Sequence, residues 1–263
     1  MDDSPRALTS KVSDAWTSGG ATEVVRRAWF RARVYGRQGP LASLRLVSEV
    51  DALVVSNPRV AVQLATDTSI APAEEKPFRP ARQPESTSAR SAKSGWSSEY
   101  DLGSRSQSAL LELVRLLRPE IVIETGVAAG ASTVQILSGL EANGSGRLVS
   151  IDVTPDVGQL VPPSLRTRWQ LTVLPHERKR QALSQVIESN RGFQLFVHDS
   201  DHAEEWQRFE YELALAHAGP RAMICSDDVE ASPAFLDFCR AQGLRPVLLL
   251  DGPKVMGLVR LTG

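Results

Sequence analysis

Residues 121–132, IVIETGVAAGAS, join a short β-branched run to the start of a helical pattern through a turn with two glycines. The run at 121–124 is typical of a buried strand, and the residues behind the turn have helical spacing. Gly126 and Gly130 are spaced G-x-x-x-G, unlike the G-x-G-x-x-G of dinucleotide sites. Glycines at such a turn permit close approach by a ligand. The stretch therefore predicts either a ligand-binding turn or a tight strand-to-helix turn without a ligand.

The alternation of strand and helix continues to the end of the chain. Further strands are expected at 146–153, 169–175, 193–199 and 221–228, and helices at 106–119, 132–142, 203–218 and 232–243, with a polar helix through Arg180 and Ile187. Residues 245–261 are typical of two strands joined by a turn at 251–253. We therefore predict an α/β fold with a doubly wound, mostly parallel sheet whose last strand is antiparallel. Ligands of such sheets bind at the carboxyl ends of the strands.

The first third of the chain has a different character. Residues 21–36 and 40–57 carry apolar residues at helical spacing, which predicts a helical N-terminal region over 1–68. Residues 69–98 are rich in Pro, Ser and Arg and almost without aliphatic side chains, so we interpret them as a linker or mobile lid. The α/β domain is expected over 99–263.

Composition excludes several classes of protein. The chain has 263 residues, of which 42% are hydrophobic and 23% charged, with a formal net charge of −1. This charge disfavours a nucleic-acid surface, which usually shows a basic excess. Cys225 and Cys239 are the only cysteines, and their spacing fits neither a disulfide framework nor a zinc cluster. The polar N-terminus and the lack of a long apolar run predict a cytoplasmic protein without a membrane partner. The sequence is compatible with a homo-oligomer and does not decide the oligomeric state.

Acidic residues follow two of the expected strands. Asp199, Asp201 and His202 come after the fourth strand, and Asp227 and Asp228 end the fifth. Adjacent parallel strands would bring these carboxylates together, where they would repel one another unless a cation lay between them. Oxygen ligands suit Mg²⁺. The alternative is that these residues belong to ordinary loops and helix caps.

Other ionisable residues stand at positions with a chemical interpretation. Glu124, at the end of its strand, could accept from a ligand ammonium. Asp152 ends the next strand and is placed to accept both hydroxyls of a ribose, although an aspartate that caps a turn is the competing interpretation. His202 lies on the same side as Asp199 and could remove a proton near pH 7. His198 should point to the opposite face, as a packed core or interface histidine.

Four segments in order, IVIETGVAAGAS, VSIDV, VHDSDHAEEW and ICSDDV, resemble the class I S-adenosylmethionine-dependent methyltransferases. The closer likeness is to the metal-dependent O-methyltransferases of the catechol, caffeoyl-CoA, macrolide-sugar and cephalosporin-biosynthesis types. The resemblance covers residues 100–263 and implies the Rossmann-like methyltransferase fold, with a seven-stranded sheet. It extends to none of the residues before about 95.

The resemblance also implies roles for particular residues. The cofactor would be S-adenosyl-L-methionine, together with Mg²⁺ or a similar divalent cation. Cofactor contacts are implied for Glu124, Gly126, Gly130, Ser132, Asp152 and Asp199, and metal ligation for Asp199, Asp227 and Asp228. His202 stands where catechol-type enzymes carry a lysine as general base, as it does in the sugar-modifying members. This departure favours an aliphatic or sugar hydroxyl over a catechol.

We therefore expect an O-methyltransferase that acts on a hydroxyl of a small molecule, with a sugar, glycoside or natural product favoured as acceptor. Two alternatives stay open. An NAD-dependent oxidoreductase could use the same type of sheet, but the glycine spacing and the paired acids disfavour it. A non-catalytic module could retain the cofactor pocket, although each catalytic role has an intact candidate residue. The acceptor itself cannot be deduced from the sequence.

Overall fold

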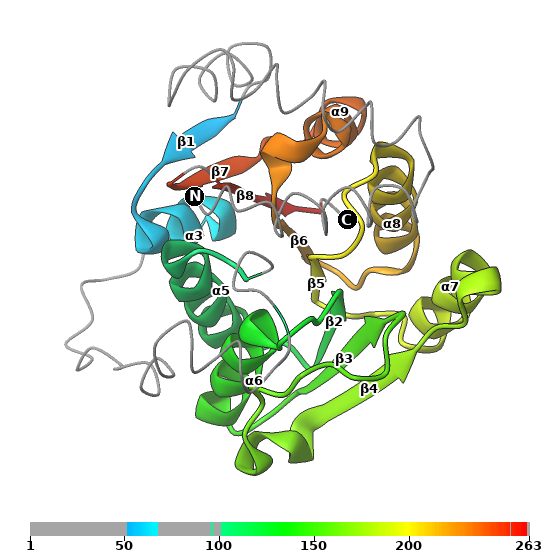
Figure 1. Cartoon of the computed structure of the whole chain (residues 1–263). Coiled ribbons are helices and arrows are strands. Elements are labelled where there is room, and N and C mark those ends of the chain that lie inside the picture. Colours follow the sequence, from blue (N-terminus) through cyan, green and yellow to red (C-terminus); the bar gives the residue numbers. More distant parts are fainter. Residues whose placement is uncertain (1–51, 68–95, 97–100, 253, 262–263) are drawn as a thin grey trace, which may run out of the picture.

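The computed structural model describes residues 52–67, 96, 101–252 and 254–261 (Figure 1). The helices expected before residue 52 and nearly all of the segment 69–98 lie outside the described residues. In the described part, an eight-stranded sheet carries helices on both faces. None of its helices has the length and apolar character that a membrane span requires.

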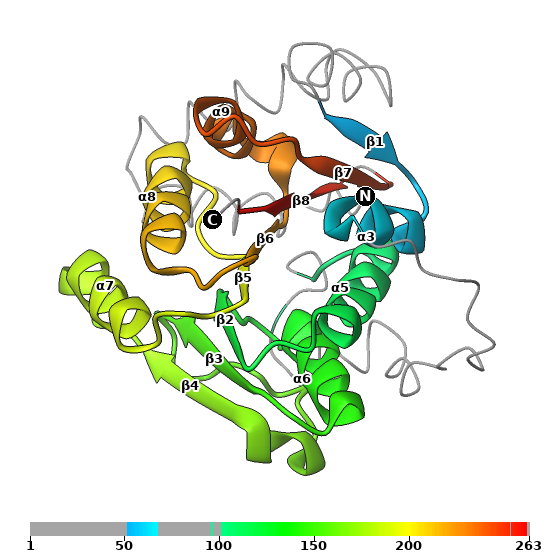
Figure 2. The same ribbon diagram turned by 180° about the vertical axis from the view of Figure 1, so that it is seen from behind.

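The sheet has the strand order β1-β7-β8-β6-β5-β2-β3-β4. The strands are β1 (Leu53–Val55), β2 (Ile121–Thr125), β3 (Arg147–Asp152), β4 (Trp169–Val173), β5 (Leu195–His198), β6 (Met223–Ser226), β7 (Val247–Asp251) and β8 (Lys254–Arg260). β8 runs antiparallel to both β6 and β7, and the other neighbouring pairs are parallel. The prediction of a mostly parallel sheet with an antiparallel last strand is confirmed. Figure 2 shows β1 and β4 at opposite edges.

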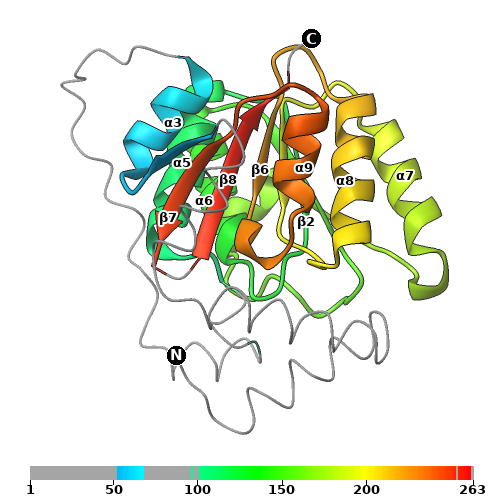
Figure 3. The same ribbon diagram turned by 90° about the horizontal axis from the view of Figure 1, so that it is seen from above.

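The helices divide between the two faces of the sheet (Figure 3). One face is covered by α3 (Pro58–Thr66), α5 (Ser104–Leu117) and α6 (Ala131–Asn143), and the other by α7 (Lys179–Ser189), α8 (Glu204–His217) and α9 (Ala234–Ala241). Short 3₁₀ turns lie at Pro163–Arg168, His176–Arg178 and Val229–Ala231. From residue 104 onward, the expected helices and strands are present in the predicted order.

The helical prediction for the N-terminal region is wrong at residues 53–55. These residues form β1, which pairs in parallel with β7 and adds an eighth strand to the expected seven. Val54 and Val55 are β-branched and fit a pleated strand, and the helix begins only at Pro58, where the Asn57 side chain accepts from two backbone N–H groups. A helix is present at Pro58–Thr66, after the segment 40–57 in which helical spacing was noted and within the region 1–68.

The core consists of two apolar layers, one on each face of the sheet. Alternation within β2 illustrates their origin, since Val122 packs toward α5 and α6 while Ile123 packs toward α7, α8 and α9, and both are 0% exposed. β5 lies between β2 and β6, so the carboxyl ends of these three strands meet at one edge of the sheet. The loops that follow them build the candidate site.

Candidate functional site

Three aspartates gather where β5 and β6 end. The backbone N–H of Asp199 donates to the Thr125 carbonyl at 2.8 Å, and that of Asp227 donates to the His198 carbonyl at 2.9 Å. Burial raises the pKa of Asp199 well above its ordinary value, and the neighbouring Asp227 raises it further. Asp228 follows in the left-handed backbone region, with φ at 47°, a conformation that aspartate tolerates better than most residues. The structure therefore places the three predicted metal ligands together.

A lysine lies between two of these carboxylates. Lys254, the first residue of β8, has its Nζ 3.3 Å from Asp227 Oδ2 and 3.1 Å from Asp228 Oδ1. The antiparallel hairpin brings it there, because β8 returns between β7 and β6. Burial and Asp228 raise the pKa of Asp227 to about 7, while Lys254 opposes that rise. The cation of this cluster therefore comes from the chain itself.

The three carboxylates do not fit a metal ion in this arrangement. Within the described ranges, no group of three or more His, Cys, Asp or Glu side chains is arranged to hold one. One oxygen of Asp227 and one of Asp228 are in contact with the ammonium of Lys254. Asp201 does not join the cluster, because its Oδ1 accepts from the Ala203 N–H at 3.0 Å and its Oδ2 lies 3.7 Å from Lys179 Nζ.

His202 lies beside the cluster in a neutral state. Its Nε2 is 4.0 Å from Asp228 Oδ2 and is buried without a hydrogen-bond partner in the described part of the chain, although the side chain as a whole is 24% exposed. Burial lowers the pKa of His202 to about 4, against the opposing effect of Asp228. The imidazole is therefore neutral at pH 7 and able to accept a proton, with a carboxylate at hand to stabilise the imidazolium.

The glycine turn accommodates the protein's own backbone. Gly126 has φ at +84°, and a Cβ there would lie 2.0 Å from the carbonyl oxygen of Asp199. Gly130 has φ at +95°, and a Cβ there would lie 3.0 Å from Gly158 Cα. Both glycines are therefore required by close backbone packing and by backbone conformation, whether or not a ligand also approaches the turn.

Glu124 is a buried carboxyl with one oxygen unused. It is 0% exposed and faces α6, where its Oε2 accepts from Thr133 Oγ1 at 2.9 Å and from Ser150 Oγ at 2.5 Å. Its Oε1 is buried with no hydrogen-bond partner among the described residues. Burial raises the pKa of Glu124 to about 7, against the lowering effect of its hydrogen bonds. Ser132, another predicted contact, is buried at the start of α6, close enough to Glu124 to help lower its pKa.

Asp152 ties two turns together at the end of β3. Its Oδ2 accepts from the Val127 N–H and its Oδ1 from the Thr154 N–H, each at 2.9 Å. The turn-capping interpretation of this aspartate therefore describes its contacts in the structure. A carboxylate oxygen can accept more than one hydrogen bond, so both oxygens retain the capacity to accept from a ribose.

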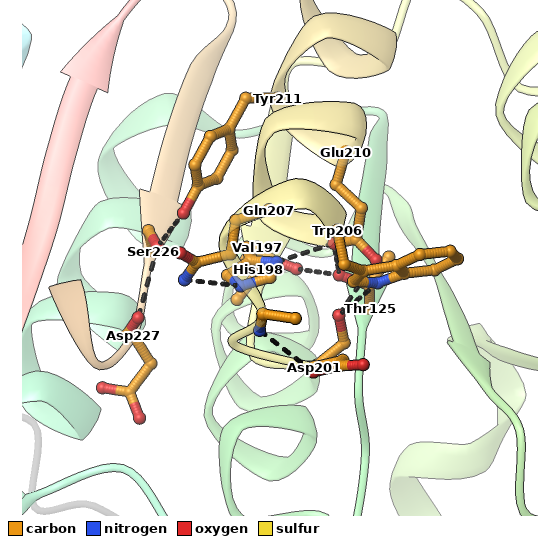
Figure 4. Close-up of polar contacts among 12 residues, drawn as sticks. Thr125, Val197, His198, Asp201, Trp206, Gln207, Glu210, Tyr211, Ser226 and Asp227 are labelled. Atoms are coloured by element: carbon orange, nitrogen blue, oxygen red, sulfur yellow. Dashed lines mark hydrogen bonds and ion pairs between the residues drawn. The ribbon is translucent and has the colours of Figure 1, made fainter. Parts of the chain in front are cut away.

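A buried polar network supports the strand ends from the side of α8 (Figure 4). Glu210 is its centre, because its Oε2 lies 2.6 Å from both Thr125 Oγ1 and His198 Nδ1, and its Oε1 accepts from Ser200 Oγ at 2.9 Å. The other ring nitrogen of His198, Nε2, lies 3.2 Å from Nε2 of Gln207. His198 is thus a packed core histidine, as predicted, and the network links the ends of β2 and β5.

Comparison with known proteins agrees with this arrangement. Residues 123–229, which span β2 to β6 and the aspartate cluster, match the family described as a methyltransferase domain. This part of the chain is similar to a methyltransferase domain. No curated protein matches the sequence.

Solved structures resemble the methyltransferase domain in fold. An O-methyltransferase from Bacillus cereus, in complex with SAH, is 17% identical at a TM-score of 0.51, covering 61% of this chain and 83% of its own. The O-methyltransferase TomG from Streptomyces achromogenes, in complex with SAM, is 15% identical at a TM-score of 0.55, covering 68% and 92%. A methyltransferase from Geobacter sulfurreducens is 16% identical at a TM-score of 0.51, covering 69% and 92%. At these identities the likeness shows the class I methyltransferase fold alone.

The sequence analysis missed two residues of the candidate site. Glu210 stands one helical turn after the buried Trp206 on α8 and one turn before the buried Ala214, so a charge within an apolar stripe was the available signal. Lys254 follows a turn and resembles an ordinary exposed hairpin lysine. Its role depends on strand order, which the local sequence does not specify.

Glu124→Gln is expected to stabilise the methyltransferase domain at pH 8. The pKa of Glu124 is raised from 4.5 to about 7, so the unfolded chain loses this proton at lower pH than the folded chain. The free energy of unfolding therefore falls as the pH rises from about 4.5 to about 7. Above that range the loss amounts to up to about 3 kcal/mol. Glutamine removes this loss, and the advantage should vanish near pH 4. Urea unfolding at the two pH values measures the difference, with the exposed Glu177→Gln as control. A variant less stable than wild type at pH 8 would contradict the assignment.

Proposed function

We propose that this chain is an S-adenosylmethionine-dependent O-methyltransferase that methylates a hydroxyl of a small molecule, preferring a sugar, glycoside or natural product to a catechol. The observation that carries the proposal is the neutral Nε2 of His202 beside Asp228, which has no hydrogen-bond partner in the described part of the chain and lies within the match to a methyltransferase domain. We also propose a cytoplasmic location, which the two free, buried cysteines support.

The residues at the ends of β2 and β3 fit the cofactor. The unused Oε1 of Glu124 is an acceptor suited to the ammonium of the methionine moiety, and the buried carboxyl would ionise when that charge arrives. Asp152 would accept from the ribose hydroxyls while it continues to hold the Val127 turn. S-adenosylmethionine, when bound, supplies an electrophilic methyl group on a sulfonium.

His202 would take the proton of the acceptor. As the acceptor oxygen forms its bond to the methyl carbon, the carbon–sulfur bond breaks and its electron pair remains on sulfur as a neutral thioether. The hydroxyl proton passes to Nε2 of His202, and Asp228 stabilises the resulting imidazolium. Holding both reactants in line contributes much of the rate enhancement in such transfers. The divalent cation implied by the resemblance is not part of this mechanism, because Lys254 contacts both Asp227 and Asp228.

Cofactor binding is the first test. The demethylated product S-adenosylhomocysteine, at about a hundred times its dissociation constant, should stabilise the wild-type fold by about 2.7 kcal/mol. Asp152→Ala should lose most of this stabilisation, because the ribose acceptor is gone. Each variant is compared with its own ligand-free form by thermal unfolding, since Asp152 also caps two turns.

Asp156→Ala is the matched control, because this aspartate lies in the loop after β3 and its side chain accepts only from Gln159 among the described contacts. It should retain the full ligand-induced shift. An undiminished shift in Asp152→Ala would place the nucleoside elsewhere. A mass-spectrometric screen for methylated sugars, glycosides and phenols then tests the reaction and ranks the acceptors.

A further inference from the structure

The ammonium of Lys254 contacts three oxygen atoms of the chain. Its Nζ lies 3.2 Å from the Asp101 carbonyl oxygen, 3.3 Å from Asp227 Oδ2 and 3.1 Å from Asp228 Oδ1. The contacts with the Asp101 carbonyl and Asp227 Oδ2 are hydrogen bonds, and the contact with Asp228 Oδ1 is an ion pair. Lys254 therefore binds three oxygen atoms of the chain itself.

The hairpin that carries Lys254 is fixed at both sides. The next residue, Val255, donates its N–H to Glu230 Oε2 at 2.7 Å, which ties β8 to the turn after Asp228. On β7, Asp251 Oδ2 accepts from the Ser106 N–H at 2.9 Å, at the start of α5. These contacts place the lysine independently of its own ion pairs.

The position of Lys254 matches the charge requirement of the cluster. Three neighbouring carboxylates need a positive partner, and the Lys254 side chain is only 21% exposed. The ammonium contacts both Asp227 and Asp228, and Asp228 in turn faces His202.

We propose that Lys254 supplies, from within the chain, the positive charge that the resemblance assigns to a divalent metal, so that the aspartate cluster binds no divalent cation. In this arrangement Lys254 is a positioning residue, which holds Asp228 beside His202. The positioning role in catalysis rests on the proposed function, whereas the claim about metal binding does not.

Mn²⁺ binding, followed by the electron paramagnetic resonance signal of the free ion, tests the proposal without any substrate. Wild-type protein should leave Mn²⁺ free, because the ammonium already contacts the carboxylates. Lys254→Met keeps an unbranched side chain that is shorter by one atom and removes the charge. It should bind Mn²⁺ at least about tenfold more tightly than wild type, because hard cations favour carboxylate oxygens. Lys179→Met removes a lysine near Asp201, outside the cluster, and should behave like wild type.

Mn²⁺ binding by wild type as tight as by Lys254→Met overturns the proposal, and so does an absence of binding in both proteins, since the cluster would then need no cation. If Lys254→Met does not fold, Lys254→Gln replaces it in the comparison. Tight Mn²⁺ binding by the wild type would by itself decide against the proposal. In the methylation assay, wild type should keep its turnover in excess chelator, and loss restored by Mg²⁺ overturns the proposal. A wild type that methylates no acceptor under either condition counts against the proposed function, and the Mn²⁺ comparison still decides the role of Lys254.

Discussion

His202→Ala is expected to lower turnover by about 10²- to 10⁴-fold, the usual loss when a general base is removed. The Nε2 of His202 is a buried acceptor without a hydrogen-bond partner among the described residues, and Asp228 Oδ2 lies 4.0 Å away to stabilise the protonated ring. Proton removal matters chiefly in the transition state, so kcat should fall while affinity for S-adenosylmethionine changes little. Steady-state kinetics at saturating cofactor, with binding measured separately, distinguishes the two effects.

The pH–rate profile identifies the role of His202 more sharply. A base must be unprotonated to act, and burial lowers the pKa of His202 to about 4. Wild-type turnover should therefore fall only as the pH drops toward 4, and the His202→Ala variant should lack this acidic limb. The exposed His176→Ala serves as control and should keep both rate and profile. If the variant loses stability but keeps wild-type turnover per folded molecule, His202 is structural, and rescue by high Mg²⁺ would indicate metal ligation.

The order of elements from α5 to β8 was predictable because the relevant signals are local. Apolar periodicity separates strands from helices, and Pro119 and the glycine turn mark where segments end. Convergence of Asp199 with Asp227 and Asp228 was also predictable, since it needs only that β5 and β6 be neighbours with their carboxyl ends together. Side chains alternate between the two faces of a strand, so the direction of His198, opposite to that of Asp199, could also be predicted.

The remaining features depend on long-range packing. The β-branched run at 53–55 has helical spacing with the residues before it, and it becomes a strand because the edge of β7 is free to pair with it. Lys254 reaches the cluster only because β8 inserts between β7 and β6, which brings the hairpin to residues 27 positions earlier in the chain. The pKa of His202 was expected near neutrality, and its value of about 4 results first from burial, which no local pattern encodes.

Glu210→Ala is expected to lower the free energy of unfolding by about 3–5 kcal/mol, because three buried polar groups would lose their common acceptor. Glu210 is 1% exposed, and its carboxylate contacts Thr125 Oγ1, His198 Nδ1 and Ser200 Oγ. Alanine would leave these groups buried without their acceptor, and an unsatisfied buried polar group costs about 1–3 kcal/mol. The measurement is urea unfolding of wild type and variant at neutral pH.

Glu212→Ala is the matched control, because this glutamate lies on the same helix, is exposed, and has the same propensity change on substitution. It should alter stability by less than about 0.5 kcal/mol. Glu210→Gln should be intermediate, since its amide oxygen can still accept from one or two of the neighbours but carries no charge. A loss below about 1 kcal/mol in Glu210→Ala would mean that the three groups find other partners. The network of Figure 4 would then not be what holds the ends of β2 and β5 together.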